Sequence, residues 1–447
     1  MTLRGNILTT LSARVGLLAT ALISSVVLAR GLGPESRGLF ALVLLLPDWA
    51  RSLGLLGFEQ ANAVYAGLEP GRRHALVWHS VAIAVVVGGT CALGGVAFFM
   101  LDAPGASSLL KGPFWLYLLP LSAVPARLLF EYWGAVLRGL NRIVLLNAVD
   151  LGTKVVSLAL VVVFVAWLHL GVAGAVWVDT LVTVGGVVVL GALLWLSGAW
   201  GWPTFDRSLM KRTAGFAIPA HAGSIAAYLN YRGGELIIAM LLPPEQLGFY
   251  VIAVGIAERL WILPSAVTTS LLPHLTNARQ RDPALTAIVA RHVMAWVGAG
   301  CVLVFVLAGF LVPFLYSSAF EPAVTPLRWL LPGVFALSVG KILVAELLAR
   351  ERPRYTVYAS GAAGVVSLAS NLVLVPQLGI SGAAIASTLS YGLLSVILTR
   401  YYLRETGHSW TVLVPKWSDL QAYASVWSRR RPTGAPSPAH TLGAENR

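Results

Sequence analysis

The chain has 447 residues, of which 57% are hydrophobic and only 11% are charged, and its formal net charge is +13 at pH 7. With a mean hydropathy of +0.77, this composition excludes a soluble globular domain and indicates a polytopic membrane protein. The two cysteines, Cys91 and Cys301, fall inside apolar stretches, where a cysteine behaves as a small hydrophobe. We therefore expect no disulfide and no metal site.

Apolar stretches long enough to cross a bilayer follow one another along the chain. Twelve of them are predicted to be transmembrane helices: 7–29, 39–58, 75–100, 113–137, 143–168, 173–198, 214–242, 248–271, 292–316, 327–349, 355–376 and 380–402. The first begins close to Met1, is too long for the apolar core of a signal peptide and lacks a small-residue cleavage site. We expect it to be retained, so the predicted fold is an all-α, twelve-helix membrane protein.

Basic residues concentrate in every second connection between these stretches. They are Arg72, Arg73, Arg138, Arg142, Arg207, Lys211, Arg212, Arg279, Arg281, Arg291, Arg350, Arg352 and Arg354. Three of the alternate connections, 169–172, 243–247 and 377–379, contain no lysine or arginine. Because basic residues mark the cytoplasmic ends of membrane helices, we expect both termini in the cytoplasm and the protein in the cytoplasmic (inner) membrane.

The chain matches itself at a nearly constant distance. Three segments recur in the same order, 210 or 208 residues later: 32–38 as 242–248, 155–158 as 365–368, and 170–181 as 378–389. The first match contains Pro-Glu-x-x-Gly in a polar loop, where chance similarity between apolar helices does not explain it. Two homologous halves are typical of secondary transporters, whose binding sites lie between the repeats. The alternative is chance similarity among Leu-, Val- and Gly-rich helices.

The duplication predicts three regions. Residues 1–205 would form an N-terminal six-helix bundle and residues 206–402 a C-terminal six-helix bundle. Residues 403–447 would form a cytoplasmic tail, in which 417–428 has apolar residues at helical spacing followed by three arginines. This segment is either an interfacial helix or an exposed one. The end from residue 432 is rich in Pro, Gly, Ala and Ser and should be disordered.

Fourteen ionisable residues fall inside the predicted membrane stretches: Arg14, Asp48, Arg51, Arg127, Glu131, Asp150, Lys154, Asp179, Arg232, Glu235, Glu258, Arg259, Lys341 and Glu346. Such residues are costly in hydrocarbon and usually face a bundle interior or a wet cavity. Four oppositely charged pairs have the spacing of one helix face and could be purely structural: Asp48 with Arg51, Arg127 with Glu131, Asp150 with Lys154, and Arg232 with Glu235.

Other charges have no such local partner. Arg259 is mid-span, has no oppositely charged residue three or four positions away, and should meet another helix, water or an anionic substrate. Arg51 falls mid-span in the corresponding helix of the first half, and a carboxylate is repeated at the 210 spacing close to each of these arginines. Four residues are candidates for ion coupling or for lining a cavity: Asp48, Glu258, Asp179 and Lys341.

Three segments resemble a known family. Residues 28–38 (LARGLGPESRG) and 54–57 (GLLG) resemble the opening of polysaccharide exporter flippases, the O-antigen flippase-like branch of the multidrug/oligosaccharidyl-lipid/polysaccharide exporter superfamily. Residues 378–384 (LGISGAA) resemble a segment that precedes the last span in that family. The resemblance covers roughly residues 5–402. Its motifs mark the superfamily well and the substrate poorly.

This resemblance implies a V-shaped pair of bundles that opens a central cavity to each side of the membrane in turn. It implies an undecaprenyl-diphosphate-linked glycan as substrate and makes Arg14, Arg51 and Arg259 the candidates for binding the diphosphate. A guanidinium stays charged and binds phosphate oxygens in a bidentate manner. Membrane lipids are further partners, and a polysaccharide polymerase or glycosyltransferases of the same pathway could be others. The twelve predicted spans differ from the fourteen usual in lipid II flippases.

Three functions are therefore considered. The first is a flippase for a lipid-linked oligosaccharide or exopolysaccharide precursor. The second is a cation-coupled drug or metabolite exporter of the same fold, against which the deep arginines count, since such cargo is usually cationic. The third is a membrane glycosyltransferase or polysaccharide polymerase, which generally needs a sizeable extracytoplasmic loop with catalytic residues, and this chain has none. The sequence predicts a transporter with no catalytic residues, no cofactor and no nucleic-acid partner.

Overall fold

The computed structural model describes residues 3–276 and 285–414, with side chains described for residues 16–269, 271, 275 and 285–414. Every regular element in this part of the chain is helical. The predicted tail helix at 417–428 and the predicted disordered end lie outside the described residues. The same holds for the side chain of Arg14, whose backbone lies in the first helix.

Fifteen α-helices lie in the described residues. The first half contains α1 (Leu3–Gly54), α2 (Phe58–Leu68), α3 (Arg73–Ile83), α4 (Gly89–Met100), α5 (Ala106–Leu109), α6 (Trp115–Ser122), α7 (Val124–Gly139), α8 (Ile143–Val161) and α9 (Gly171–Leu196). The second half contains α10 (Arg207–Leu241), α11 (Pro244–Arg259), α12 (Ile262–Thr276), α13 (Leu285–Tyr316), α14 (Val324–Ala349) and α15 (Pro353–Thr406). Short π-helical turns continue α3 into α4 and extend α8.

The apolar stretches identified in the sequence all lie on these helices. By length and composition, seven helical segments among the described residues could cross a membrane, or eight when α11 and α12, bent by 43° at their junction, count as one span. Two long helices each contain two predicted spans, because α1 breaks at Gly33 and α15 breaks at Gly379. The protein is thus a multi-pass helical membrane protein, whereas the number of twelve spans remains a prediction.

The internal duplication has a counterpart in the backbone. Gly171 and Gly379, which are 208 residues apart in matching segments, have φ angles of +58° and +59°. Two further matching glycines lie where a helix returns against the preceding one: a Cβ on Gly174 would be 3.1 Å from the Phe164 carbonyl oxygen, and one on Gly382 would be 2.1 Å from that of Leu374. Similar sequences therefore form similar tight bends in the two halves.

The repeated Pro-Glu-x-x-Gly motifs contact each other directly. A Cβ on Gly38 would come within 1.7 Å of the Pro244 carbonyl oxygen, and a Cβ on Gly248 within 2.3 Å of that of Pro34. Each glycine thus allows one half of the chain to approach the backbone of the other, in a reciprocal crossing of α1 and α11. Only glycine fits at such a distance.

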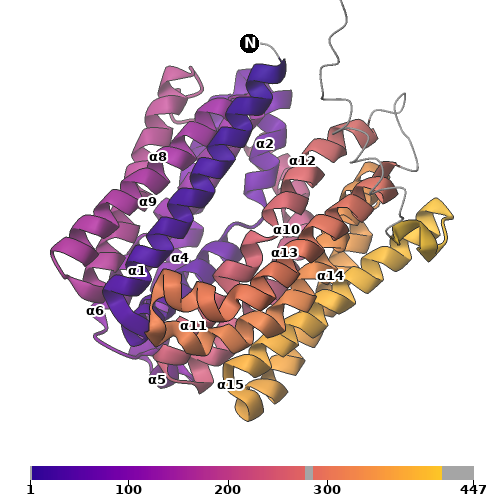
Figure 1. Cartoon of the computed structure of the whole chain (residues 1–447). Coiled ribbons are helices and arrows are strands. Elements are labelled where there is room, and N and C mark those ends of the chain that lie inside the picture. Colours follow the sequence, from indigo (N-terminus) through magenta and orange to yellow (C-terminus); the bar gives the residue numbers. More distant parts are fainter. Residues whose placement is uncertain (1–2, 277–284, 415–447) are drawn as a thin grey trace, which may run out of the picture.

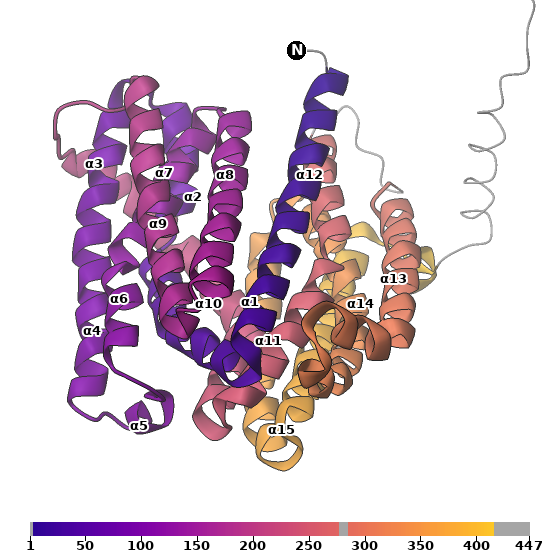
Figure 2. The same cartoon turned by 60° about the vertical axis from the view of Figure 1, so that its left-hand side comes forward.

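Two cationic side chains join the halves at the same end. Lys111 donates to the Leu242 carbonyl oxygen at the end of α10 (2.7 Å), and Arg30 donates to the Leu315 carbonyl oxygen at the end of α13 (2.8 Å). Cations at helix C-termini satisfy carbonyl groups that have no partner within the helix. Figure 2 shows α1, α10 and α11 between the remaining helices of the two halves, with this crossing at the end of the molecule opposite the N-terminus.

At the other end, the start of α10 lies against the first half. The Asp206 carboxylate accepts hydrogen bonds from Ser208 and Leu209 and thereby caps α10, and these bonds lower the pKa of Asp206 to about 2. Arg72 contacts the same carboxylate (3.4 Å). These contacts fix the start of α10, after the connection that follows α9. Figure 1 shows the helices in sequence colours, with α8 and α9 on one side and α14 and α15 on the other.

Candidate functional site

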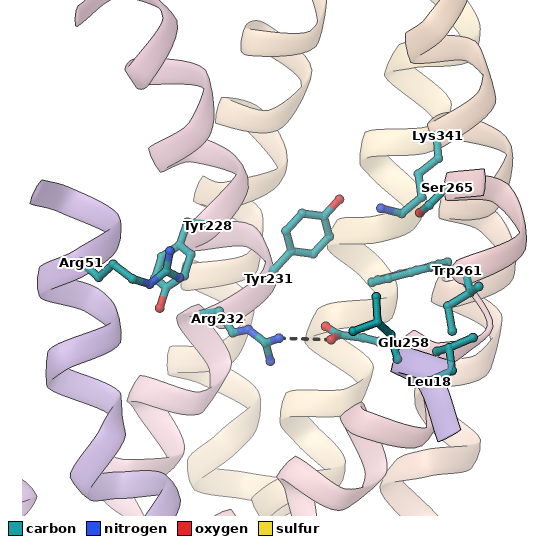
Figure 3. Close-up of a pocket in the computed structure, with 11 residues that line it drawn as sticks. Leu18, Arg51, Tyr228, Tyr231, Arg232, Glu258, Trp261, Ser265 and Lys341 are labelled. Atoms are coloured by element: carbon teal, nitrogen blue, oxygen red, sulfur yellow. Dashed lines mark hydrogen bonds and ion pairs between the residues drawn. The ribbon is translucent and has the colours of Figure 1, made fainter. Parts of the chain in front are cut away.

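A pocket of about 630 Å³ lies between the two halves, and its walls combine cations with aromatic rings (Figure 3). Residues of α1, α10, α11, α12 and α14 line it, together with the α11–α12 junction: Leu17, Leu18, Arg51, Tyr228, Tyr231, Arg232, Glu258, Trp261, Ile262, Ser265 and Lys341. Because α1 contributes residues from both sides of its break, it forms parts of two walls. Three cationic side chains against one carboxylate give this lining a formal charge of +2.

Arg232 is shared between two carboxylates. Its guanidinium contacts Glu235 on the same helix (2.5 Å) and Glu258 on α11 (3.1 Å), and its side chain is 34% exposed. In Figure 3 the Arg232–Glu258 bond spans the space between α10 and α11. An ion pair that lines a cavity in this way can exchange the carboxylate for another anion, such as a phosphate group.

Lys341 on α14 lies in an aromatic cage. Its ammonium group is 4.8 Å from the centre of the Trp261 ring and 5.5 Å from that of Tyr231. Tyr391 packs against both rings, with centroids 5.3 and 5.7 Å away. Cation–π attraction stabilises the charged lysine where little water is present. Figure 3 shows Lys341 and Trp261 on the side of the pocket opposite Arg51.

Arg51 and Lys341, on opposite sides of the pocket, each take part in a contact that recurs at equivalent positions of the internal repeat. Arg51 and Glu131, in contact at 3.3 Å, correspond at the 210 spacing to Trp261 and Lys341, which also contact each other. In the first half the cation is Arg51, and in the second half it is Lys341, the equivalent of Glu131. The two halves therefore keep a contact between equivalent positions, which is an ion pair in the first half and a cation–π pair in the second.

A second pocket of about 450 Å³ adjoins the first, since Leu17 and Arg51 line both. It lies within the first half, between α1, α7, α8 and α9. Its charged lining residues balance: Arg51, Arg127, Lys154, Glu131, Asp150 and Asp179. Arg127 bridges two helices, because its guanidinium bonds both Asp48 on α1 (3.0 Å) and Asp179 on α9.

Two of the four expected local pairs are confirmed. Asp48 contacts Arg51 at 4.0 Å, and Glu235 contacts Arg232 at 2.5 Å. The expected pairing of Arg127 with Glu131 is wrong, because each binds a partner on a neighbouring helix instead. The expected pair of Asp150 with Lys154 likewise does not form an ion pair among the described residues, although both line the second pocket. Spacing along one helix cannot reveal which helices will pack beside it.

The structure distributes the predicted binding residues unevenly. Arg51 lines both pockets, whereas Arg259 lines neither of them and donates a hydrogen bond to the Gly255 carbonyl oxygen on its own helix (2.5 Å). No opposite charge lies one turn away from Arg259, as the sequence shows, but a backbone carbonyl there supplies a hydrogen-bond partner that residue types do not reveal. Arg232, interpreted from the sequence as half of a structural pair, is the second arginine in the pocket wall.

The four residues predicted to line a cavity or couple ions lie in different places. Glu258 and Lys341 line the central pocket and Asp179 lines the second one, while Asp48 pairs with Arg127 beside it. Each of the three carboxylates is bound to an arginine of another helix. The sequence does mark Lys341 as the repeat equivalent of another charged residue, Glu131, which lies 210 residues earlier.

Comparisons with known proteins agree with this architecture. The family model described as "Polysaccharide biosynthesis protein" matches residues 27–325, which is more than half of the chain. A search of curated proteins gives no significant match.

Among solved structures, an inward-facing multidrug resistance MATE family transporter of the MOP superfamily is similar with a TM-score of 0.72 and 14% identity, over 88% of this chain and 94% of that one. The lipid II flippase MurJ in an inward closed conformation is similar with a TM-score of 0.71 and 11% identity, over 96% of this chain and 94% of that one. An outward-facing MATE family transporter scores 0.60 with 16% identity, over 88% and 95%. At these identities the likeness concerns the fold alone. The chain belongs to the polysaccharide biosynthesis protein family and has the helical fold of MOP superfamily transporters.

Proposed function

We propose that the protein is a flippase that moves a lipid-linked oligosaccharide or exopolysaccharide precursor across the cytoplasmic membrane by alternating access. Its substrate would be a glycan carried on undecaprenyl diphosphate, and its action would involve no covalent step and no cofactor. Residues 1–205 and 206–402 would act as two bundles, with both termini in the cytoplasm. The observation that carries this proposal is the central pocket with its excess of two positive charges.

The charge of the pocket suits a diphosphate. Arg51, Arg232 and Lys341 reach it from three helices, so an anion between them would be contacted from several sides. Arginine offers a planar set of donors to phosphate oxygens, and lysine adds a compact charge. An entering diphosphate would take the place of Glu258 on Arg232. Binding would thereby release a carboxylate and couple substrate entry to a change between α10 and α11.

The aromatic residues suit a sugar. Tyr228 and Tyr231 lie about one turn apart on α10 in the pocket wall, and Tyr228 packs edge-on against Trp49 with ring centroids 5.0 Å apart. Aromatic rings combine an apolar face with a polar group, which suits a ligand that has both apolar faces and hydroxyl groups. We propose that these rings contact the first sugars after the diphosphate.

The contact of the halves suits alternating access. One close approach between them is the crossing at Gly38 and Gly248, at the end that carries the connections predicted to lie outside. Closure at this end, together with the greater similarity to an inward-facing relative than to an outward-facing one, supports a state that receives substrate from the cytoplasm. Rocking of the bundles would then separate the two glycines and expose the pocket to the outside.

A cation-coupled exporter is the second candidate, favoured by the three carboxylates in the lining of the second pocket. Three cations balance them there, and the central pocket repels cationic cargo. In the flippase, we propose that Asp48, Asp179 and Glu258 instead take part in ion coupling by exchanging their arginine partners. Efflux of an organic cation by cells expressing the protein, with no flipping of a lipid-linked glycan, would favour the exporter.

The test is a flipping assay in proteoliposomes that contain a fluorescent lipid-linked oligosaccharide. Arg232→Lys keeps the charge beside Glu235 and Glu258, so it should fold, but it loses the bidentate contact with phosphate. We expect its flipping rate to fall about tenfold, which corresponds to about 1.4 kcal/mol. Arg51→Gln and Lys341→Gln should also reduce flipping, since each removes one of the three cations.

Arg328→Lys is the matched control. Arg328 lies at the outer part of α14, where it contacts Phe305, and lines neither charged pocket. This variant should flip at the wild-type rate. Wild-type flipping by Arg232→Lys and by both glutamine variants would overturn the proposed site. Arg259→Ala in the same assay decides the sequence-based hypothesis, since loss of flipping at normal abundance would place Arg259 in the binding path after all.

A further inference from the structure

An apolar groove of about 480 Å³ runs between α8 and α9. Val149 and Gly186 lie buried at its base, whereas Val156, Leu181 and Val189 are 45 to 51% exposed along its rim. A helix pair that faces hydrocarbon exposes such side chains to lipid. The groove therefore opens toward the bilayer along the side of the first half.

Two glycines give the groove its depth. A Cβ placed on Gly152 or on Gly185 would meet no neighbouring atom within 4 Å, so a side chain can begin there in open space. By contrast, Gly186 is packed against the Phe130 ring, which a Cβ would approach to 2.7 Å. The open glycines are thus not explained by close packing of α8 on α9.

The groove adjoins the charged pockets. Thr153 and Val182 line both the groove and the second pocket, and Arg51 and Leu17 line both the second pocket and the central one. A path of lining residues therefore leads from the bilayer through α8 and α9 to Arg51. The lining residues are apolar in the groove and include charged side chains in the second pocket, with Thr153 at the boundary.

The substrate of a lipid-linked glycan flippase poses a physical problem that such a path solves. Its head group must enter a polar cavity, while its hydrocarbon chain stays out of water because exposure of each methylene group is unfavourable. We infer that the polyprenyl chain of the substrate lies in the α8–α9 groove while its diphosphate reaches Arg51 and the central pocket. This inference rests on the proposed function and adds to it the binding site of the lipid chain.

A second apolar groove provides an internal comparison. It lies between α13 and α14, has a volume of about 360 Å³, and is lined by Cys301, Val302, Phe305 and Pro332 among others. None of its lining residues lines either charged pocket. An ordinary phospholipid chain would occupy both grooves alike, whereas the chain of a substrate held at Arg51 would occupy the α8–α9 groove.

Photocrosslinking in proteoliposomes separates these cases. One probe is a polyprenyl diphosphate with a diazirine in its chain, and the other is phosphatidylglycerol with a diazirine in an acyl chain. Mass spectrometry of the full-length protein should find the polyprenyl probe on α8 and α9 about tenfold more than on α13 and α14. The phospholipid probe should label both grooves equally. Equal labelling of both grooves by the polyprenyl probe, or labelling of α13 and α14 alone, would overturn the inference.

Filling the groove gives an independent readout. Gly152→Leu combined with Gly185→Leu places side chains in open space and replaces glycine by a better helix former, so the variant should fold. It should lose polyprenyl labelling and flip about tenfold more slowly, yet bind geranyl diphosphate, whose short chain does not need the groove, as the wild type does. Val302→Phe, in the other groove, is the control and should flip normally.

The failures of the two proposals differ. If the wild type flips the lipid-linked glycan and the filled variant flips it equally fast, the groove assignment is wrong and the flippase function stands. If the wild type flips no such lipid, the proposed function is wrong, and the groove assignment fails with it.

Discussion

Arg127→Met tests whether the charges in the first half are paired between helices or along one helix. The guanidinium of Arg127 bonds Asp48 and Asp179, and its side chain is only 10% exposed. After its removal, Asp48 still has Arg51 at 4.0 Å, but the structure gives Asp179 no second ion pair among the described residues. The variant therefore leaves one carboxylate, on α9, without its counter-charge.

The size of the effect follows from this single orphaned group. Breaking a buried ion pair by removing one partner typically costs about 3 to 5 kcal/mol. Asp179 is 25% exposed and can take up a proton instead of remaining charged, so we expect about 3 kcal/mol, the lower end of that range. Such a loss lowers the ratio of folded to unfolded protein about a hundredfold.

Double variants identify the partner. Arg127→Met with Asp179→Asn removes both charges of the interhelical pair and should restore most of the lost stability. Arg127→Met with Glu131→Gln should restore none, since Glu131 binds Arg51 rather than Arg127. Thermal unfolding in detergent, followed by the amount of monodisperse protein that remains, measures all four proteins. Rescue by Glu131→Gln and not by Asp179→Asn would refute the reasoning and reinstate the pairing along α7.

Three further outcomes are expected. Gly38→Val places a side chain where a Cβ would be 1.7 Å from the Pro244 carbonyl oxygen, so it should separate the halves at this crossing. A cysteine introduced in the central pocket by Ser265→Cys should then react with a membrane-impermeant thiol reagent added from outside, and unchanged labelling would argue against closure at this crossing. A reporter fused after Gln377 should read outside and one after Arg352 inside, and the reverse pattern would contradict the basic-residue argument. Asp206, whose pKa is lowered to about 2 in the folded protein, stabilises the start of α10 above its ordinary pKa near 3.8 and loses this contribution as pH falls toward 2. Asp206→Ala should therefore lower thermal stability at pH 7 and have little effect at pH 2, and an equal effect at both would contradict the capping role.

Much of the fold follows from sequence alone because membrane helices obey strong local rules. A hydrocarbon environment requires continuous apolar helices, so the stretches are visible as composition, and all lie on helices of the structure. The repeat was equally visible, and the equivalent bends at Gly171 and Gly379 lie in its matching segments. That a carboxylate recurs at positions 48 and 258 was also a property of the sequence.

The site depended on the tertiary structure. Whether an arginine binds a neighbour on its own helix, a carboxylate on another or a carbonyl behind it depends on the packing and rotation of helices, which sequence spacing does not encode. Arg232 and Arg259 look alike as deep arginines, yet one reaches across to Glu258 in the pocket wall and the other turns back to Gly255. Electrostatic partners are chosen at distances of about 3 to 4 Å, within which a rotation of one helix by a single residue exchanges one partner for another.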